Sequence, residues 1–303
     1  MTADLSNKYK FTFNAPFDWE RTIRYIGRYE NDQTHAVAGG CYRQVLGDES
    51  GYFLVELAPE GEQSVSAQIV KGIETKSRRL LVSRLVERTF GPDDVLLDFY
   101  QFASKHNYLS SLVERFYGLR VVGVVSLWEC LGWSIIGQQV SVASAFATRS
   151  RLAHFANAVV EYDGKEYTGF PLPEAVLAMT LDELKSCGLS KPKAEYLQGL
   201  ASEIILHHLN EDEVSGLPPA DCRRRLLELR GIGPWSADYA GMRIHNNPDA
   251  CPFEDIGLRN ALRRELRFSH QPTIAETEQL TASWQPFRSY ATFYIWFTLI
   301  DSL

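Results

Sequence analysis

The sequence predicts a mainly α-helical protein that carries a small α+β module at its N-terminus. Residues 10–70 hold short runs of β-forming residues separated by turn residues, which is typical of strands. From about Lys71 onward, apolar residues recur at the spacing of amphipathic helices. This change of pattern divides the chain into an N-terminal α+β module, residues 1–73, and a helical region, residues 74–303.

The N-terminal module is expected to contain one helix and several strands. Residues 18–29 place Trp19, Ile23 and Ile26 at helical spacing, with Asp18 as the N-cap. Residues 10–13 alternate polar and aromatic side chains. Three further strands are expected at residues 41–46, 51–57 and 64–70, because the sequences GDES and APEGE supply turns between them.

The helical region is expected to run almost without interruption. Residues 77–90 form a helix with one apolar face, which we assign to Leu80, Leu81, Leu85 and Val86. Residues 127–136 form a second helix that ends at Gly137-Gln138-Gln139, and a helix rich in small residues follows it. The glycines and prolines of residues 164–173 indicate a loop without repetitive structure. Residues 274–303 are helical and strongly aromatic.

Composition and charge exclude several classes of protein. The chain has 303 residues, of which 45% are hydrophobic, so it can bury a large core. Its net charge of -7 and pI of about 5.6 argue against binding nucleic acid over a broad basic surface. Residues 223–267 are the exception, because they hold nine arginines against six acids. A local anion-binding patch is therefore expected there.

The five cysteines form no CxxC pair, which argues against a disulfide framework, a zinc ribbon and an iron–sulfur cluster. No run of 18 apolar residues and no signal core occur, so we expect no contact with a membrane. We expect a cytoplasmic protein, or a nuclear one in a eukaryote. Nothing indicates an obligate oligomer, so a monomer is expected.

Residues 226–240 predict two helices joined by a tight hairpin at Gly231-Ile232-Gly233-Pro234. The glycines permit positive φ, and Pro234 fits the first turn of the second helix. Free N–H groups at that helix start can bind a phosphate oxygen. An ordinary interhelical turn is the alternative. We also consider a sodium or potassium ion held by three backbone carbonyls, and no other cofactor is expected. These carbonyls belong to Leu227, Leu229 and Gly231.

Asp255 follows the hairpin by a short loop and precedes another helical run. It is either a plain helix N-cap or a working carboxylate, and Glu254 beside it is an alternative acid. Trp235 and Tyr239 lie four residues apart, so they share a helical face. They are either core residues or the wall of a pocket for a flat or cationic ring. No HExxH, GxSxG or P-loop motif occurs.

The segment LRGIGPWSADYA, followed by PFEDIGLRNA, resembles the hairpin and the Gly/Pro-rich loop with its aspartate in the helix-hairpin-helix DNA glycosylases. Within that family it is similar to the 3-methyladenine DNA glycosylase II group. Four more segments agree in order, namely SIIGQQVSVASA, GFPLPEAV, GLSKPKAEYLQGLA and PFRSYATFYIW. The resemblance covers residues 120–300 and implies the helix-hairpin-helix glycosylase fold, with two helical subdomains flanking an active-site cleft.

The resemblance implies a role for each matching residue. Asp255 is the catalytic carboxylate. Trp235 stands where lyase-competent relatives carry a lysine nucleophile, which places the chain in the monofunctional branch. Gln139 stands at the position of a wedge that enters the DNA stack. The base pocket is implied to consist of Trp235, Tyr239, Gln138 and Phe287, where Phe287 replaces a tryptophan. The expected DNA contacts are Gln139, Gly231, Gly233, Trp235 and Ser236.

The function implied by the resemblance is base excision repair of double-stranded DNA that contains damaged bases. An alkylated purine such as 3-methyladenine or 7-methylguanine would be flipped out and released by hydrolysis, leaving an abasic site. Two alternatives stay open at this point. One is a bifunctional oxidised-base glycosylase/lyase, and the other is a non-catalytic protein that binds damaged DNA.

Overall fold

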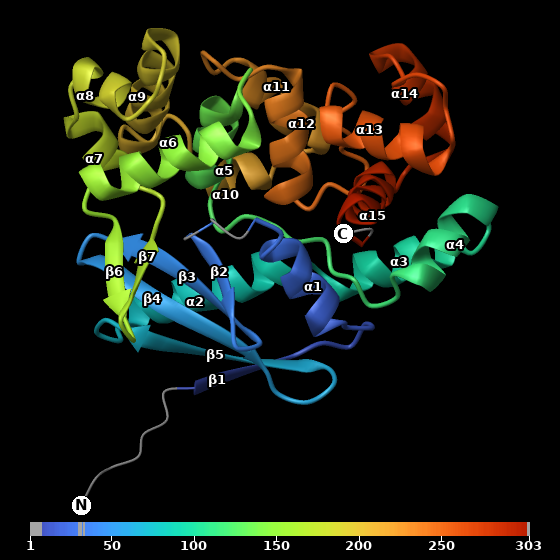
Figure 1. Ribbon diagram of the computed structural model, residues 1–303, viewed down its shortest axis with the longest axis horizontal. Coiled ribbons are helices and arrows are strands. Elements are labelled where there is room, and N and C mark those ends of the chain that lie inside the picture. The colour runs from blue at the N-terminus through green and yellow to red at the C-terminus, as the bar shows by residue number, and fades with distance from the viewer. Residues whose placement is uncertain (1–7, 30–31, 33, 302–303) are drawn as a thin grey trace, which may run out of the picture.

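The computed structural model describes residues 8–301 apart from residues 30, 31 and 33. An antiparallel five-stranded sheet forms the N-terminal part, in the order β1-β5-β4-β3-β2. Helices lie in a broad layer above this sheet (Figure 1). The strands are β1 (Lys8–Thr12), β2 (His35–Ala38), β3 (Cys41–Asp48), β4 (Gly51–Pro59) and β5 (Ser64–Lys71).

The sheet and its first helix follow from local sequence signals. Strands β1, β3, β4 and β5 lie where the alternating segments predict them. Helix α1 (Trp19–Ile26) begins at Asp18, whose side chain accepts a hydrogen bond from the backbone N–H of Arg21. The expected N-cap is therefore confirmed. Strand β2 was not expected, because its short sequence, HAVA, carries neither alternation nor a strong β-former pattern.

The first helices after the sheet are α2 (Lys76–Phe90), α3 (Asp93–Ala103) and α4 (Asn107–Arg115). In α2, Val82, Leu85 and Val86 are buried, whereas Leu80 is 65% exposed. The expected apolar face was therefore wrong at Leu80, since the buried stripe lies further round the helix. The division expected at residue 73 falls between β5 and α2, and the apolar core continues across this link.

A hairpin stands where the sequence analysis expected an irregular loop. Strands β6 (Val159–Tyr162) and β7 (Lys165–Thr168) pair around Asp163 and Gly164, whose φ angles are 52° and 68°. Two positive φ angles in a two-residue turn match the right-handed twist of paired strands. The hairpin reaches from the helical layer down to the sheet (Figure 1) and packs on β3 and β4.

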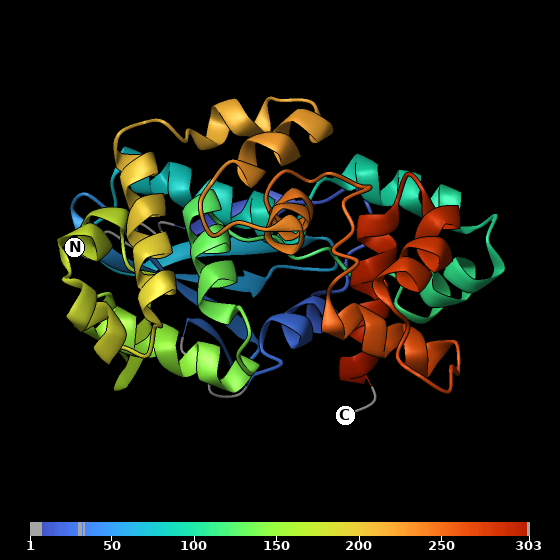
Figure 2. The ribbon, with the colours of Figure 1, turned by 90° about the horizontal axis from the view of Figure 1, so that it is seen from above.

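The remaining helices form the layer that contains the helical hairpin at residues 231–234. The first group comprises α5 (Leu127–Gly137), α6 (Val142–Phe155), α7 (Pro173–Ala178), α8 (Leu181–Ser186), α9 (Lys191–Ile205), α10 (Glu211–Ser215), α11 (Pro219–Leu227) and α12 (Pro234–Arg243). The second group comprises α13 (Ile256–Glu265), α14 (Ile274–Thr281), the 3-10 helix η1 (Ala282–Trp284) and α15 (Arg288–Asp301). Seen from above, α12 lies on the side of the first group that faces the second (Figure 2).

Two large apolar cores hold the molecule together. One is formed within α5–α12. The other joins the N-terminal module and α2–α4 to α13–α15, so it unites segments from both ends of the described chain. Because α12 belongs mainly to the first core and α13 to the second, the loop between them crosses the junction of the two. No helix among the described residues is long and apolar enough to cross a membrane.

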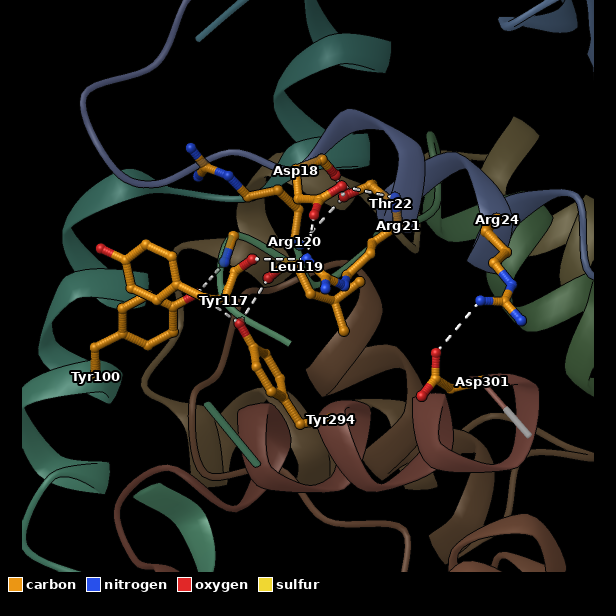
Figure 3. A network of polar contacts seen from close by, with 11 residues as sticks. Asp18, Arg21, Thr22, Arg24, Tyr100, Tyr117, Leu119, Arg120, Tyr294 and Asp301 are labelled. Atoms are coloured by element: carbon orange, nitrogen blue, oxygen red, sulfur yellow. Dashed lines mark hydrogen bonds and ion pairs between the residues drawn. The ribbon is translucent and has the colours of Figure 1, made fainter. Parts of the chain in front are cut away.

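Polar contacts fasten α15 to the N-terminal half of the chain (Figure 3). The hydroxyl of Tyr294 donates to the carbonyl of Leu119 at 2.8 Å and lies 2.8 Å from the hydroxyl of Tyr100. At the far end of α15, Arg24 pairs with Asp301 at 3.3 Å. These contacts fix α15 against α1 and α3, and α15 supplies a residue to the site described next.

Candidate active site

The hairpin joins α11 to α12 as the sequence predicts, but only one glycine has the left-handed conformation. Gly231 has φ of +90°, and a Cβ atom there would lie 2.5 Å from the ring of Tyr196. Gly233 instead has φ of -101° in extended backbone and serves as the N-cap of α12. Positive φ is therefore required at Gly231 alone, where both the backbone and the neighbouring ring exclude a side chain.

The start of α12 has no capping side chain. Gly233 has no side chain with which to cap the helix, and Pro234 carries no N–H group. The backbone N–H groups of Trp235 and Ser236 therefore have no partner inside the helix. These groups, together with the positive end of the helix dipole, suit a phosphate oxygen.

Gln138 and Gln139 lie beside the hairpin. Gln138 is the C-cap of α5, and its side-chain Nε2 donates to the carbonyl of Gly231 at 2.8 Å. The structure thus places Gln138 on the hairpin itself, and Gln138 does not line the cavity next to Tyr239. Gln139 follows it with φ of 53° and is exposed. Its side chain is available to a ligand that binds across the hairpin.

Asp255 is both a helix cap and the centre of a hydrogen-bonded cluster. Its Oδ1 accepts from the backbone N–H of Leu258 at 2.6 Å, which caps α13. The indole N–H of Trp235 donates to Oδ2 at 3.1 Å, and that of Trp296 donates to Oδ1 at 3.0 Å. Helices α12, α13 and α15 therefore converge on one carboxylate. The same carboxylate therefore caps α13 and is the candidate catalytic group, so the two roles expected for Asp255 are compatible.

Burial and hydrogen bonding shift the pKa of Asp255 in opposite directions. Burial raises the pKa of the carboxyl above its ordinary value, because an ionised group loses hydration there. The donors from Leu258, Trp235 and Trp296 oppose this rise by stabilising the ionised form. Glu254, the alternative acid, is exposed. The local structure therefore favours Asp255 as the candidate carboxylate.

An aromatic pair leads from Asp255 to a cavity. The rings of Trp235 and Tyr239 stack with centroids 5.2 Å apart and planes 14° apart. Beyond Tyr239 lies a cavity of about 70 Å³ between α1, α5, α6 and α12. Tyr25 from α1 and Trp133 from α5 contribute further aromatic walls. A flat ring placed near Asp255 would therefore meet aromatic surfaces.

Phe287 does not line this cavity, so its place in the base pocket stays a prediction. Its ring packs against Phe102 and Phe99 of α3, with centroids 5.2 and 6.0 Å away. It lies just before α15, whereas Trp296 inside α15 contacts Asp255. Trp296 cannot be singled out from the sequence, because the aromatic residues of this tail share helical spacing and only packing separates core residues from site residues.

The chain belongs to the HhH-GPD superfamily of base excision DNA repair proteins, whose family model matches residues 133–286. The matched region runs from α5 to the residues just before α15, so it contains the hairpin, Trp235, Tyr239 and Asp255. The fold class that the sequence resemblance implied is thereby confirmed.

Named relatives agree over most of the chain. It is 28% identical to a DNA-3-methyladenine glycosylase of Bacillus subtilis over 283 residues, which cover 92% of this chain and 93% of the relative. It is 26% identical to DNA-3-methyladenine glycosylase 2 of Escherichia coli, with 96% and 97% covered. A solved 3-methyladenine DNA-glycosylase from Archaeoglobus fulgidus shares the fold, with a TM-score of 0.80, 23% identity, and 97% and 98% covered.

Proposed function

We propose that the protein is a monofunctional DNA glycosylase that flips alkylated purines out of double-stranded DNA and releases them by hydrolysis, leaving an abasic site. One observation carries this proposal. The half-buried carboxylate of Asp255 is held by N–H donors from three helices, beside a stacked aromatic pair and a hairpin that can bind phosphate. The named activity of the relatives agrees with it.

Asp255 suits the charge that develops on the sugar. An N-alkylated purine such as 3-methyladenine or 7-methylguanine carries a positive charge, so it leaves without further protonation. The deoxyribose then gains oxocarbenium character, as in other glycoside hydrolyses. An ionised carboxylate beside the anomeric carbon stabilises that cation and orients the attacking water, from which it accepts a proton.

Trp235 determines the type of reaction. A lyase needs an amine that forms a Schiff base with the sugar, whereas this position holds an indole whose N–H donates to Asp255. The indole also stacks on Tyr239, which extends the surface available to a flipped base. The same residue thus orients the carboxylate and supplies no nucleophile, which favours simple hydrolysis.

The hairpin holds the DNA backbone under this proposal. The N–H groups of Trp235 and Ser236 bind a phosphate, and Gln139 enters the stack from the neighbouring loop. A sodium or potassium ion is proposed on the carbonyls of Leu227, Leu229 and Gly231. The carbonyls of Leu229 and Gly231 each already accept a bond, from Ile232 and Gln138, but a carbonyl oxygen has two lone pairs. Each of these two carbonyls therefore keeps a lone pair that a monovalent cation could use.

Incubation of the protein with methylated duplex DNA tests the proposal. Released bases are identified by mass spectrometry, and a parallel reaction contains borohydride to trap any Schiff base. Release of 3-methyladenine and 7-methylguanine without a trapped adduct is expected. A trapped adduct would establish a lyase instead. Binding of damaged DNA with no released base would leave only a non-catalytic binding protein.

A further inference from the structure

We propose that Tyr25 is the proton donor when this protein releases damaged purines that carry no charge. The inference rests on the proposed glycosylase function and concerns the same pocket. A neutral purine leaves poorly because the bonding electrons would make it an anion. A proton donor near the base removes that obstacle.

Tyr25 is placed on the wall of the cavity next to the site. It lies on α1, is only 4% exposed and lines the cavity together with Tyr239. Tyr239 stacks on Trp235, which donates to Asp255. A base that reaches into the cavity from Asp255 would therefore meet the side chain of Tyr25.

The hydroxyl of Tyr25 has an unused proton. Its oxygen accepts a hydrogen bond from Nη1 of Arg243 at 2.9 Å. Among the residues that the structure describes, none accepts a hydrogen bond from this hydroxyl. A buried donor without a partner is uncommon, because its lost hydration is not replaced. A ring nitrogen or carbonyl oxygen of a bound base could accept a hydrogen bond from this hydroxyl.

Arg243 prepares Tyr25 to release the proton. Its guanidinium is buried and lies 5.5 Å from the ring centroids of both Tyr25 and Tyr239. Arg28 stacks on the Tyr25 ring at 4.0 Å. Burial alone would raise the pKa of Tyr25, but the charges of Arg243 and Arg28 lower it below its ordinary value, against a smaller opposing effect of Asp255. A tyrosinate formed at this position would be stabilised by a fixed positive charge.

The step balances without any further reagent. As the C1′–N9 bond breaks, its electron pair stays on the purine and the Tyr25 proton moves to a ring nitrogen. Water attacks C1′ and loses a proton to Asp255. Solvent then returns a proton from Asp255 to Tyr25, so the sum is one water consumed and one neutral base released.

Tyr25→Phe tests the proposal because it removes only the hydroxyl. Single-turnover release is measured from duplexes that contain either hypoxanthine, which is neutral, or 7-methylguanine, which is cationic. The variant is expected to release hypoxanthine at least about 100-fold more slowly, the usual contribution of a general acid, and 7-methylguanine within about threefold of the unmodified protein. The alkaline fall in hypoxanthine release should also disappear.

Tyr167→Phe is the matched control. Tyr167 lies on β7, is buried, and its hydroxyl accepts from Nη1 of Arg43 at 2.9 Å, which is the same kind of pair away from the site. This control should release both bases at the unmodified rate. Thermal unfolding of both variants checks that each is folded.

Four outcomes separate the possibilities. Selective loss of hypoxanthine release in Tyr25→Phe supports the proposal. Equal losses on both bases would show a packing role, and an unchanged hypoxanthine rate would show no role, so either overturns it. Failure of the unmodified protein to release hypoxanthine, while it releases 7-methylguanine, overturns this inference and leaves the proposed function intact. Release of neither base defeats the proposed function itself.

Discussion

Replacement of Asp255 by asparagine should abolish most catalysis while it leaves the fold nearly intact. Asparagine is as good an N-cap as aspartate, so its Oδ1 can still accept from Leu258 and preserve α13. The amide, however, has one acceptor oxygen instead of two. Because Trp235 and Trp296 each donate to a different carboxylate oxygen, one indole N–H would face an amide N–H.

The size of the effect follows mainly from the lost charge. A carboxylate about 4 Å from an oxocarbenium centre contributes about 4 kcal/mol at an effective dielectric constant of about 20. That free energy corresponds to a fall of about 10³-fold in the rate of base release. Asp255→Ala should lose a similar factor in rate and, in addition, about 1 kcal/mol of unfolding free energy, because alanine cannot cap α13.

The assay combines single-turnover release of 7-methylguanine with urea unfolding of the same preparations. The comparison of the two variants separates capping from catalysis, since only the alanine variant should be clearly less stable. Release by Asp255→Asn within tenfold of the unmodified rate would refute the catalytic role of this carboxylate. It would also remove the main support for the proposed function.

Three further predictions concern residues around the same site. Trp296→Phe removes a donor that lowers the pKa of Asp255, so this pKa should rise further. Because the ionised form is the active one, base release should fail at a higher pH on the acidic side, which a pH–rate profile would detect. Gly231→Ala forces a left-handed residue and a clash with Tyr196, and should cost about 1–3 kcal/mol in urea unfolding with weaker DNA binding. Gln138→Ala removes the bond to the Gly231 carbonyl and should weaken DNA binding about fivefold in a titration, with an unchanged rate at saturation.

The parts of the fold that could be predicted are those with strong local signals. Asp18 caps α1 as expected, and β3, β4 and β5 lie within a few residues of their expected bounds. Strand β2 could not be predicted because its pairing with β3 comes from the sheet rather than from its own sequence. The β6–β7 hairpin carries a local signal, the pair Asp163-Gly164 between two β-forming runs, although the glycines and prolines around it favour a loop.

The site residues that belong to the sequence motif could be predicted. Those that reach the site only through the packing of distant helices could not. Asp255 and Trp235 follow from the motif, and the structure joins them by a hydrogen bond. Trp296 lies 41 residues beyond Asp255, and only the packing of α15 on α13 brings its indole to the carboxylate. Tyr25 is more distant still, since it reaches the cavity through the core that α1 shares with α15. No spacing rule connects such residues.

The core shared by the N-terminal module and α13–α15 also determines when the site can first exist during synthesis. The hairpin and Asp255 are translated before α15, but Trp296 must leave the ribosome before its indole can orient the carboxylate. The partner surfaces of α15, on α1 and α3, leave the ribosome long before α15 does. A nascent chain that ends before α15 would therefore contain the DNA-binding hairpin, but Asp255 would lack the hydrogen bond from Trp296. Such a chain is expected to bind DNA without cleaving the glycosidic bond.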